Sequence, residues 1–298
     1  MPQQKYGIIG LGAMGMGMAK SLMRAGLSTC GYDLNATVQA NFVQAGGNGA
    51  DSIEELAAEV DVLFLVVVNS AQIEDVLFGS GRAASEMRPG SLVIACSTVK
   101  PDFARDMEKQ LSGLGVLYLD APISGGAVKA AAGTMTIMAS GIPAAFTKAE
   151  KALEAVAENV YRMGNSAGSG SGMKIVNQLL AGVHIAAAAE AMALGLSMGL
   201  EANAVYEVIT HAAGNSWMFE NRMAHVLAGD YEPLSAVNIF VKDLGIVAET
   251  AREQDMPAPL AATALQQFVT ARAQGFGQED DSAVIKIFPG ITLPVGSK

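Results

Sequence analysis

The sequence predicts an α/β protein, in which a doubly wound parallel sheet precedes an all-α second half. Three observations carry this prediction. In the first half, short apolar runs alternate with helical patterns, as in successive strand–helix–strand units. A glycine-rich turn of the G-x-G-x-x-G type directly follows the first apolar run. After a second glycine-rich segment, which begins near Gly164, only helical patterns remain.

The expected strands of the first half are short and apolar. They are residues 6–10, 28–33, 61–68, 91–96, 116–120 and 134–140. The run 61–68 is nearly continuous in apolar residues, which is typical of a central parallel strand with both faces covered. Helices are expected between the strands at residues 14–25, 37–44, 53–59, 73–76 and 101–114.

The second half begins with residues 164–172, which are all Gly, Ser, Asn or Ala and indicate a linker. Helices are then expected at residues 173–200, 202–213, 216–228, 237–254 and 260–274, and an irregular tail after Ala283. The sequence therefore predicts an N-terminal domain over residues 1–164 and an all-α C-terminal domain over residues 165–298, joined by a long interdomain helix.

The composition is that of a globular protein and disfavours two classes of partner. Of the 298 residues, 51% are hydrophobic and 16% are charged, so the chain can bury a large core. The net charge of −10 disfavours phosphate backbones and anionic lipid, and we expect neither nucleic-acid nor membrane binding. Residues 176–200 are long and apolar enough to cross a bilayer, but polar residues such as His184 and Glu190 interrupt them, which favours a buried helix.

Cysteine and histidine content bears on location and on metal binding. The two cysteines, Cys30 and Cys96, lie in apolar runs and form no disulfide framework, and no secretory apolar region opens the sequence, so we expect a cytoplasmic protein. The three histidines lack metal-ligand spacing, and we expect no metal. The adjacent acids Asp280 and Asp281 are interpreted as solvated surface.

The first glycine-rich turn consists of Gly10, Leu11, Gly12, Ala13, Met14 and Gly15. Its first glycine permits a tight turn, its second lets the backbone approach a pyrophosphate, and its third lets strand and helix pack closely. The pyrophosphate would lie at the helix N-terminus, where unpaired N–H groups and the helix dipole favour an anion. Because the turn joins a strand to a helix, it predicts a Rossmann dinucleotide-binding domain rather than an ordinary glycine turn.

Asp33 ends the second expected strand, about 20 residues after the first glycine, as the ribose-binding acid of such domains does. Its carboxylate would bond the ribose hydroxyls and repel a 2′-phosphate. Leu34, Asn35 and Ala36 follow, so no arginine stands ready to neutralise that phosphate. The sequence therefore predicts NAD rather than NADP; a solvated turn residue is the alternative for Asp33.

Three further motifs follow along the chain. Residues 120–126 read Asp-Ala-Pro-Ile-Ser-Gly-Gly, residues 168–178 read Gly-Ser-Gly-Ser-Gly-Met-Lys-Ile-Val-Asn-Gln, and residues 240–244 read Phe-Val-Lys-Asp-Leu. Together with the glycine-rich turn, and in this order over essentially the whole chain, they resemble the β-hydroxyacid dehydrogenase family related to 3-hydroxyisobutyrate dehydrogenase. The resemblance implies reversible NAD-dependent oxidation of a small-molecule hydroxyacid.

The motif at residues 120–126 offers an anion site on chemical grounds. Ser124 supplies a hydroxyl, and Gly125 and Gly126 supply unhindered backbone N–H groups. The resemblance implies that these three residues hold the substrate carboxylate; a Pro-Gly loop without a ligand is the alternative.

Lys174 lies in the first turn of the expected long helix, beside an apolar run. Burial and the helix N-terminus both disfavour its charge, which would bring its pKa towards that of a general base. The resemblance matches Lys174 with the family's catalytic lysine. It matches the substrate-orienting amide with Asn177 and Gln178, which share the helix face of Lys174, and leaves open which of the two contacts substrate. A surface lysine is the alternative.

The resemblance also implies contacts to the nicotinamide half of the cofactor. Thr98, which follows the strand at residues 91–96, would approach the nicotinamide, and Val67 and Val68 would contact the cofactor through backbone and apolar surface. Lys242 would lie near both cofactor and substrate. An exposed lysine paired with an acid such as Asp243 is the alternative for Lys242.

Residues 211–222 and 233–240 resemble those of the family's L-threonate dehydrogenases more narrowly. Polar residues such as Asn215, Ser216 and Asn238 suit a polyhydroxylated four-carbon acid. The alternatives are oxidation of 3-hydroxyisobutyrate, a tartronate semialdehyde/glycerate reaction, and a dinucleotide-binding interaction module without activity. Imine reduction is disfavoured because imine-reducing relatives generally replace the lysine found here at position 174.

The long apolar helix also bears on assembly. It has too little polar surface for a lone helix. We therefore expect a homodimer or homotetramer to which this helix contributes.

Overall fold

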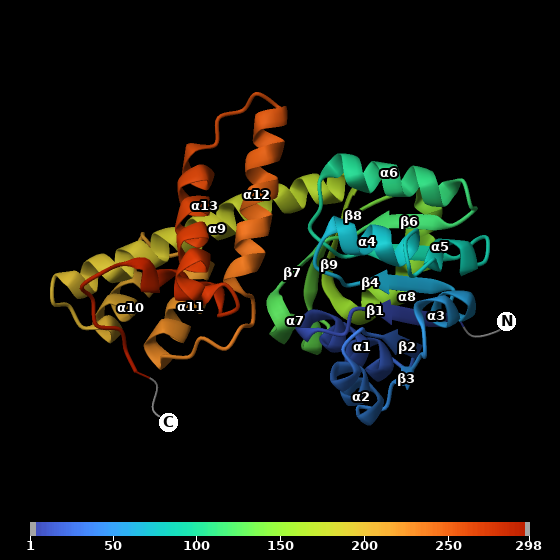
Figure 1. Ribbon diagram of the computed structural model, residues 1–298, viewed down its shortest axis with the longest axis horizontal. Coiled ribbons are helices and arrows are strands. Elements are labelled where there is room, and N and C mark those ends of the chain that lie inside the picture. The colour runs from blue at the N-terminus through green and yellow to red at the C-terminus, as the bar shows by residue number, and fades with distance from the viewer. Residues whose placement is uncertain (1–3, 296–298) are drawn as a thin grey trace. The chain divides into compact units, whose positions relative to one another are not determined.

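The computed structural model describes residues 4–295 and divides into two compact units, the first ending at Lys174 and the second beginning at Ile175. The first unit is an α/β domain and the second is helical (Figure 1). This confirms the predicted fold class.

The described residues of the first unit form one sheet of nine strands. The strands are β1 (Lys5–Ile9), β2 (Ser28–Tyr32), β3 (Asn48–Gly49), β4 (Val62–Leu65), β5 (Leu92–Ala95), β6 (Leu117–Asp120), β7 (Ile123–Ser124), β8 (Met135–Ser140) and β9 (Ala157–Gly164). Their order is β3-β2-β1-β4-β5-β6-β8-β7, with β9 paired to β8. The six strands from β3 to β6 are parallel, as expected of a doubly wound sheet.

The sheet departs from the expected all-parallel arrangement at β8. This strand runs antiparallel to β6 and β7, while β9 is parallel to it. The expected strand at residues 134–140 is therefore present, but its direction differs from expectation. The direction follows from the connection, because β7 and a short helix replace the long crossover that a parallel neighbour requires.

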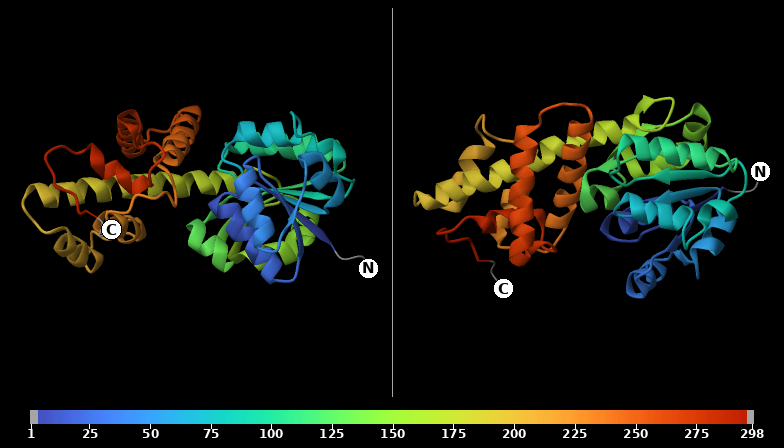
Figure 2. Two further views of the ribbon diagram at one scale, coloured as in Figure 1. Left: turned by 60° about the horizontal axis from the view of Figure 1, so that its bottom comes forward. Right: turned by 45° about the horizontal axis from the view of Figure 1, so that its top comes forward.

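Helices cover both faces of this sheet (Figures 1 and 2). They are α1 (Ala13–Arg24), α2 (Ala36–Gln44), α3 (Ile53–Glu59), α4 (Ser70–Leu77), α5 (Ala83–Glu86), α6 (Pro101–Ser112), α7 (Gly126–Ala132) and α8 (Pro143–Val156). Alternate strand residues face two separate cores: Ile8 and Phe64 pack with residues of α1 and α8, whereas Ile9 and Leu65 pack with residues of α3, α4 and α6.

The second unit contains most of α9 (Ser169–Ser197), together with α10 (Ala202–Thr210), α11 (Trp217–Ala228), α12 (Val237–Glu253) and α13 (Pro259–Ala271). Its core includes Ile185 and Met192 of α9, Phe240 and Leu244 of α12, and Phe268 of α13. The expected start of the long helix is wrong by four residues, because Ser169 to Gly172 are helical and belong to α9 rather than to a linker. A π-helical turn (Arg272–Phe276) and a 3-10 helix (Asp281–Ile287) follow α13, so the tail is more ordered than expected.

α9 is the one helix among the described residues that is long and apolar enough, by length and composition, to cross a membrane. Half of its most apolar window is buried inside the structure. A core helix of a globular protein meets the same criterion, which agrees with the interpretation of residues 176–200 as a buried helix.

The interpretation of Asp280 and Asp281 as solvated surface is wrong. Both carboxylates have no exposed area, and they pair with side chains of α11. His225 Nδ1 lies 3.2 Å from Asp280 Oδ1, and the Arg222 guanidinium binds both oxygens of Asp281. The network ties the 3-10 helix to α11, a long-range contact that adjacent acids in a sequence do not reveal.

Candidate active site

The register of the parallel strands places the predicted ligand-binding segments along one edge of the sheet. Tyr32 pairs with Ile9, Ile9 with Leu65, Leu65 with Ala95, and Ala95 with Asp120. The glycine-rich turn, the Asp33 turn and the segments that begin at positions 66, 96 and 121 each follow one of these paired ends. Ligands of doubly wound folds bind at this edge.

The glycine-rich turn is shaped as its sequence predicts. Gly10 has a φ of +90°, and a Cβ there would lie 2.5 Å from the carbonyl oxygen of Val66. A Cβ on Gly15 would lie 1.8 Å from the carbonyl oxygen of Gly10. At Gly12, by contrast, no atom of the described residues lies within 4 Å of an added Cβ. The first and third glycines are therefore required for packing, and the second leaves open space beside the turn.

The start of α1 fits the pyrophosphate of a dinucleotide. Gly12 is the N-cap residue and has no side chain to cap the helix, and the first turn holds no acidic residue. The unpaired N–H groups of the first turn therefore meet open space at Gly12 and favour an anion there.

Asp33 is built into the same loop. Its Oδ2 accepts a hydrogen bond from the backbone N–H of Leu11 at 2.7 Å, and its Oδ1 accepts one from Asn35 at 2.8 Å. The backbone N–H of Asp33 donates to Gln39 Oε1 at 2.9 Å. The carboxylate is thus held beside the turn, which is where a ribose-binding acid must be.

The segments after β4 and β5 are linked by a side-chain hydrogen bond. Ser97 Oγ donates to the carbonyl oxygen of Val67 at 2.6 Å. Thr98, the next residue, is 9% exposed, whereas Val68 is 47% exposed. Val68 therefore offers apolar surface at the binding edge, and Ser97 keeps the two segments in register.

The candidate carboxylate site comprises the end of β7 and the start of α7. Ser124 pairs with Thr136 of β8, which fixes its place on the sheet. Gly125 and Gly126 have φ values of +132° and +70°, in the region that favours glycine. A Cβ on Gly126 would meet no atom of the described residues within 4 Å. The loop therefore places one hydroxyl beside two glycines, the second of which has open space around it, as an anion site requires.

The start of α9 is fixed by a buried carboxylate, Asp120. Its Oδ2 accepts hydrogen bonds from the backbone N–H groups of Gly168 and Ser171, both at 2.9 Å, and its Oδ1 accepts one from Ser171 Oγ at 2.6 Å. Ser140 Oγ donates to Asp120 at 3.1 Å and accepts from the N–H of Gly170 at 2.9 Å. Burial raises the pKa of the Asp120 carboxyl, against the opposing effect of these hydrogen bonds.

This arrangement depends on glycine at position 170. A Cβ there would lie 2.3 Å from the carbonyl oxygen of Met138. The first turn of α9 therefore packs directly on the ends of β6 and β8. The sequence identified Asp120 only as the first residue of a loop motif, because its partners are 48 and 51 positions away along the chain.

Lys174 is 7% exposed, so its burial agrees with expectation. Its place in the first turn does not, because α9 begins at Ser169 and Lys174 lies in the second turn. The effect of a helix N-terminus falls off beyond the first turn, so the expected influence of the helix dipole on this amine does not apply at its observed position.

The second unit carries the two amides and the Lys-Asp motif. Asn177 Nδ2 donates to Gln178 Oε1 at 2.9 Å, and Gln178 Nε2 donates to Asp243 Oδ2. Lys242 Nζ lies 2.8 Å from Asp243 Oδ1, so the pairing offered as an alternative for Lys242 is present. Its side chain keeps 22% of its exposure, against 2% for Asp243.

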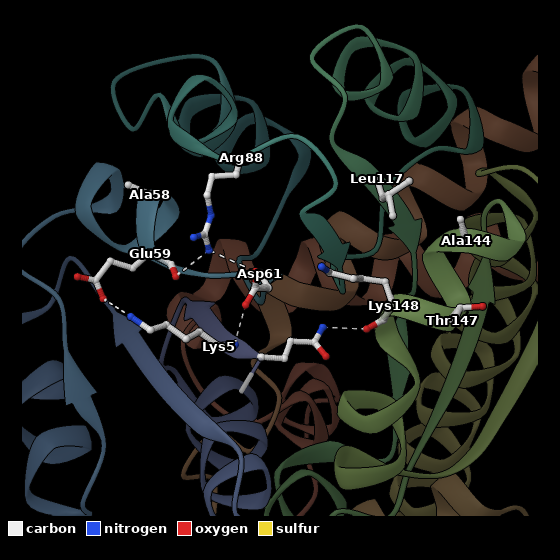
Figure 3. Close-up of a pocket in the computed structure, with 10 residues that line it drawn as sticks. Lys5, Ala58, Glu59, Asp61, Arg88, Leu117, Ala144, Thr147 and Lys148 are labelled. Carbon is white, nitrogen blue, oxygen red and sulfur yellow. Dashed lines mark hydrogen bonds and ion pairs between the residues drawn. The ribbon is translucent and has the colours of Figure 1, made fainter. Parts of the chain in front are cut away.

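A hollow of about 940 Å³ lies at the opposite edge of the sheet, near the amino ends of β1, β4 and β6 (Figure 3). Its charged lining is largely paired: Lys5 with Glu59 at 3.5 Å and Arg88 with Asp61 at 3.2 Å. None of the predicted site residues line it. This hollow is therefore not the candidate active site.

The glycine turn and the neighbouring carboxylate at one sheet edge have the geometry of a dinucleotide-binding site, and the family matches identify the class of protein as a nicotinamide-dependent dehydrogenase. Residues 5–164 match the family described as the NAD-binding domain of 6-phosphogluconate dehydrogenase, and residues 168–288 match that described as NAD-binding of NADP-dependent 3-hydroxyisobutyrate dehydrogenase. The chain belongs to the hydroxyacid dehydrogenase family related to 3-hydroxyisobutyrate dehydrogenase, which confirms the resemblance found in its motifs. It is an NAD-dependent enzyme of that family.

Several relatives cover nearly the whole chain. A protein of Cupriavidus necator named L-threonate dehydrogenase is 58% identical over 98% of both chains. One of the same name from Escherichia coli K12 is 55% identical over 97% of this chain and 96% of its own. A Salmonella typhimurium crystal structure described as 3-hydroxyisobutyrate dehydrogenase has 56% identity and a TM-score of 0.92, covering 96% of this chain and 100% of its own.

Proposed function

We propose that this enzyme oxidises L-threonate to its 2-oxo acid with NAD, with Lys174 as the general base. The observation that carries the chemistry is a buried lysine, 7% exposed, on the helix whose first turn Asp120 holds in place. The substrate rests on the relatives named L-threonate dehydrogenase, which are 50–58% identical. The similarly identical Salmonella protein carries the other name, so 3-hydroxyisobutyrate is the second candidate.

Cofactor binding in this proposal uses the edge formed by the parallel strands. Gly10, Leu11, Gly12, Ala13, Met14 and Gly15 hold the pyrophosphate, and Asp33 holds the adenosine ribose. Thr98 contacts the nicotinamide half, and Val67 and Val68 contact the cofactor through backbone and apolar surface. Lys242 lies near both cofactor and substrate. The carboxylate of Asp33 repels the 2′-phosphate of NADP, which supports the choice of NAD. Bound NAD supplies the acceptor for the hydride.

The residues of the chain orient the substrate and move one proton. Ser124, Gly125 and Gly126 bind the substrate carboxylate through a hydroxyl and backbone N–H groups. Neutral Lys174 takes the proton of the reacting hydroxyl as its C–H hydride leaves, and returns it in the reverse reaction. Asn177 orients the reacting end of the substrate. The substrate thus loses a proton and a hydride and becomes an oxo acid.

The test is NADH formation at 340 nm with L-threonate, D-threonate, 3-hydroxyisobutyrate and glycerate, each with NAD and NADP. We expect turnover of L-threonate with NAD, and a loss of at least about a hundredfold in kcat for Lys174→Ala, which is the lower end for general-base removal. Lys148→Ala, at the opposite sheet edge, is the matched control and should retain activity. Preferred turnover of 3-hydroxyisobutyrate would show that this acid, and not L-threonate, is the substrate. Full activity of Lys174→Ala would show that Lys174 is not the general base.

The proposal extends to assembly and location. Along α9 an apolar stripe is exposed, with Val176 at 55%, Leu180 at 50% and Leu194 at 59%, and Met198, just after the helix, extends it at 62%. These positions repeat at helical spacing, and such a surface favours pairing with a second copy in a homodimer or homotetramer.

Free Cys30 and Cys96 suit a reducing cytoplasm. We place the boundary between cofactor domain and helical domain at residues 164/165, in agreement with family matches over residues 5–164 and 168–288, and the compact first unit also takes in the start of α9 up to Lys174.

A further inference from the structure

Three side chains of the second unit form a chain of hydrogen bonds with a defined direction. Asn177 Nδ2 donates to Gln178 Oε1 at 2.9 Å, and Gln178 Nε2 donates to Asp243 Oδ2. Gln178 is 6% exposed and Asp243 is 2% exposed, so water does not compete freely for these groups. Both ends of the Gln178 amide are therefore in use within the protein.

The direction of this chain is set at the carboxylate end. An ionised carboxylate only accepts hydrogen bonds, so the group of Gln178 that faces Asp243 must be its NH₂. The Gln178 carbonyl then faces Asn177, which must in turn offer its own NH₂. Lys242 Nζ lies 2.8 Å from Asp243 Oδ1, so a cation faces the second oxygen of that carboxylate.

One atom of Asn177 is left for a ligand, namely Oδ1. Over residues 4–295, no hydrogen bond to this oxygen is present. Asn177 is half-buried and lies three positions after Lys174 on α9, so both side chains project from one face of the helix.

We propose that Gln178 and Asp243 are positioning residues that turn the Asn177 amide so that it presents its carbonyl oxygen to the substrate. This inference rests on the proposed function. Asn177 Oδ1 can accept a hydrogen bond from the hydroxyl of the substrate. It cannot accept one from the oxo group of the product, which has no proton to donate. Asn177 therefore recognises the hydroxyl side of the reaction, and Gln178 acts through it without touching the substrate.

The test compares the binding of hydroxyacid and oxo acid in complexes that cannot turn over. L-threonate is titrated into the enzyme with NADH, and its 2-oxo acid into the enzyme with NAD, by calorimetry. Gln178→Met removes the link while leaving Lys242 and Asp243 together. Asp243→Asn replaces the acceptor by an amide that is able to donate, so Gln178 and Asn177 are free to reverse.

In both variants we expect hydroxyacid affinity to fall by about five- to tenfold, as for the loss of one hydrogen bond, with oxo acid affinity unchanged or higher. The matched controls are Gln267→Met and Glu190→Gln, because Gln267 Nε2 donates to Glu190 Oε2 at 2.9 Å in a similar amide–carboxylate pair away from Asn177. These controls should leave both affinities unchanged.

The outcomes separate this inference from the proposed function. Equal weakening of both acids in Gln178→Met would show a general structural role and overturn the inference. Unchanged affinities in both variants would also overturn it. If the wild-type enzyme turns over none of the four acids, the proposed function fails instead, and that result comes from the NADH assay alone.

Discussion

The three glycines of the nucleotide turn have different tasks at the scale of single residues. A Cβ on Gly15 would lie 1.8 Å from a carbonyl oxygen, whereas one on Gly12 would meet no described atom within 4 Å. Gly12 also has an ordinary φ of −59°. Folding therefore requires glycine at position 15, whereas the open space at position 12 is the part of the turn that the proposed function assigns to the cofactor.

Two alanine variants test this separation. We expect Gly12→Ala to keep the wild-type melting temperature and to weaken NADH binding by at least about tenfold, or about 1.4 kcal/mol, because the methyl group occupies ligand space. Gly15→Ala should lower the free energy of unfolding by about 1–3 kcal/mol or more, as overpacking does. Thermal unfolding and NADH fluorescence titration measure the two effects. Equal losses of stability in both variants would contradict the assignment.

Residues whose position depends on local order could be predicted from the sequence. The glycine turn and Asp33 lie in one strand–turn–helix–strand unit, and the structure places both as expected. Asp120 and Gln178 show the limit. Asp120 binds residues 48 and 51 positions away, and Gln178 binds one 65 positions away, so their roles follow from tertiary packing that spacing does not encode.

At the scale of elements, the start of α9 depends on Asp120. This carboxylate accepts the N–H groups of Gly168 and Ser171 in a site with no exposure, so truncation leaves buried donors without partners. The Gly/Ser composition of residues 164–172 predicted a linker because it contains no apolar periodicity. The helix begins there because a remote side chain caps it.

Substitutions at the start of α9 should follow this pattern. We expect Asp120→Ala to destabilise the protein by about 2–4 kcal/mol and Ser171→Ala by about 1 kcal/mol, from the lost charged and single hydrogen bonds. Exposed Ser169 is the matched control, and Ser169→Ala should change stability by less than about 0.5 kcal/mol. Urea unfolding measures the free energies. Hydrogen exchange at residues 168–174 should increase first in Asp120→Ala; unchanged exchange would contradict the capping role.

The ion pairs between α11 and the 3-10 helix predict a pH dependence. The hydrogen bond to Asp280 raises the pKa of His225 above its usual value. A raised pKa in the folded state means that this contribution to stability is present below the unfolded pKa of about 6.5 and is lost as pH rises through the folded value. The pKa of Asp280 is shifted in the opposite direction. Burial raises its pKa, but hydrogen bonds from His225 and Ser282 outweigh burial and hold it at about 2.

The measurement is urea unfolding of wild type and His225→Gln between pH 2 and 9, the buffers being matched in ionic strength. Wild type should lose stability as pH rises above about 6.5, and His225→Gln should show a flatter profile over the same window. Towards acid, stability should fall between about pH 4 and 2 as Asp280 is protonated. Parallel profiles for the two proteins above pH 6.5 would contradict the role of His225.

At the scale of the whole molecule, the apolar stripe on α9 predicts self-association. Leu194→Glu places a charge in the middle of the proposed contact, and burial of an unpaired charge is costly. We expect this variant to sediment as a smaller species than wild type at micromolar concentration. Val208→Glu, at a position 64% exposed on α10, is the control and should leave the assembly intact. A monomeric wild type would remove the basis for the proposed oligomer.

The fold class was the easiest property of the chain to predict, and the strands at the edges of the sheet were the hardest. Alternation of apolar runs and helices identified the parallel strands β1, β2, β4, β5 and β6. β9 escaped prediction because its residues are mostly half-buried or exposed, with no alternation to separate it from a loop. β3 and β7 contain two residues each, too few for any pattern to appear.

These same edges have a consequence for how the chain behaves in a crowded solution. A long, regular, unpaired strand is a template on which other chains deposit as aggregates. β3 at one margin has only two residues, and β9 at the other is interrupted by two register shifts and carries Glu158 and Arg162. An incoming strand would find neither the length nor the regularity to continue the sheet. The features that made both margins hard to recognise in the sequence are those that keep the sheet from growing.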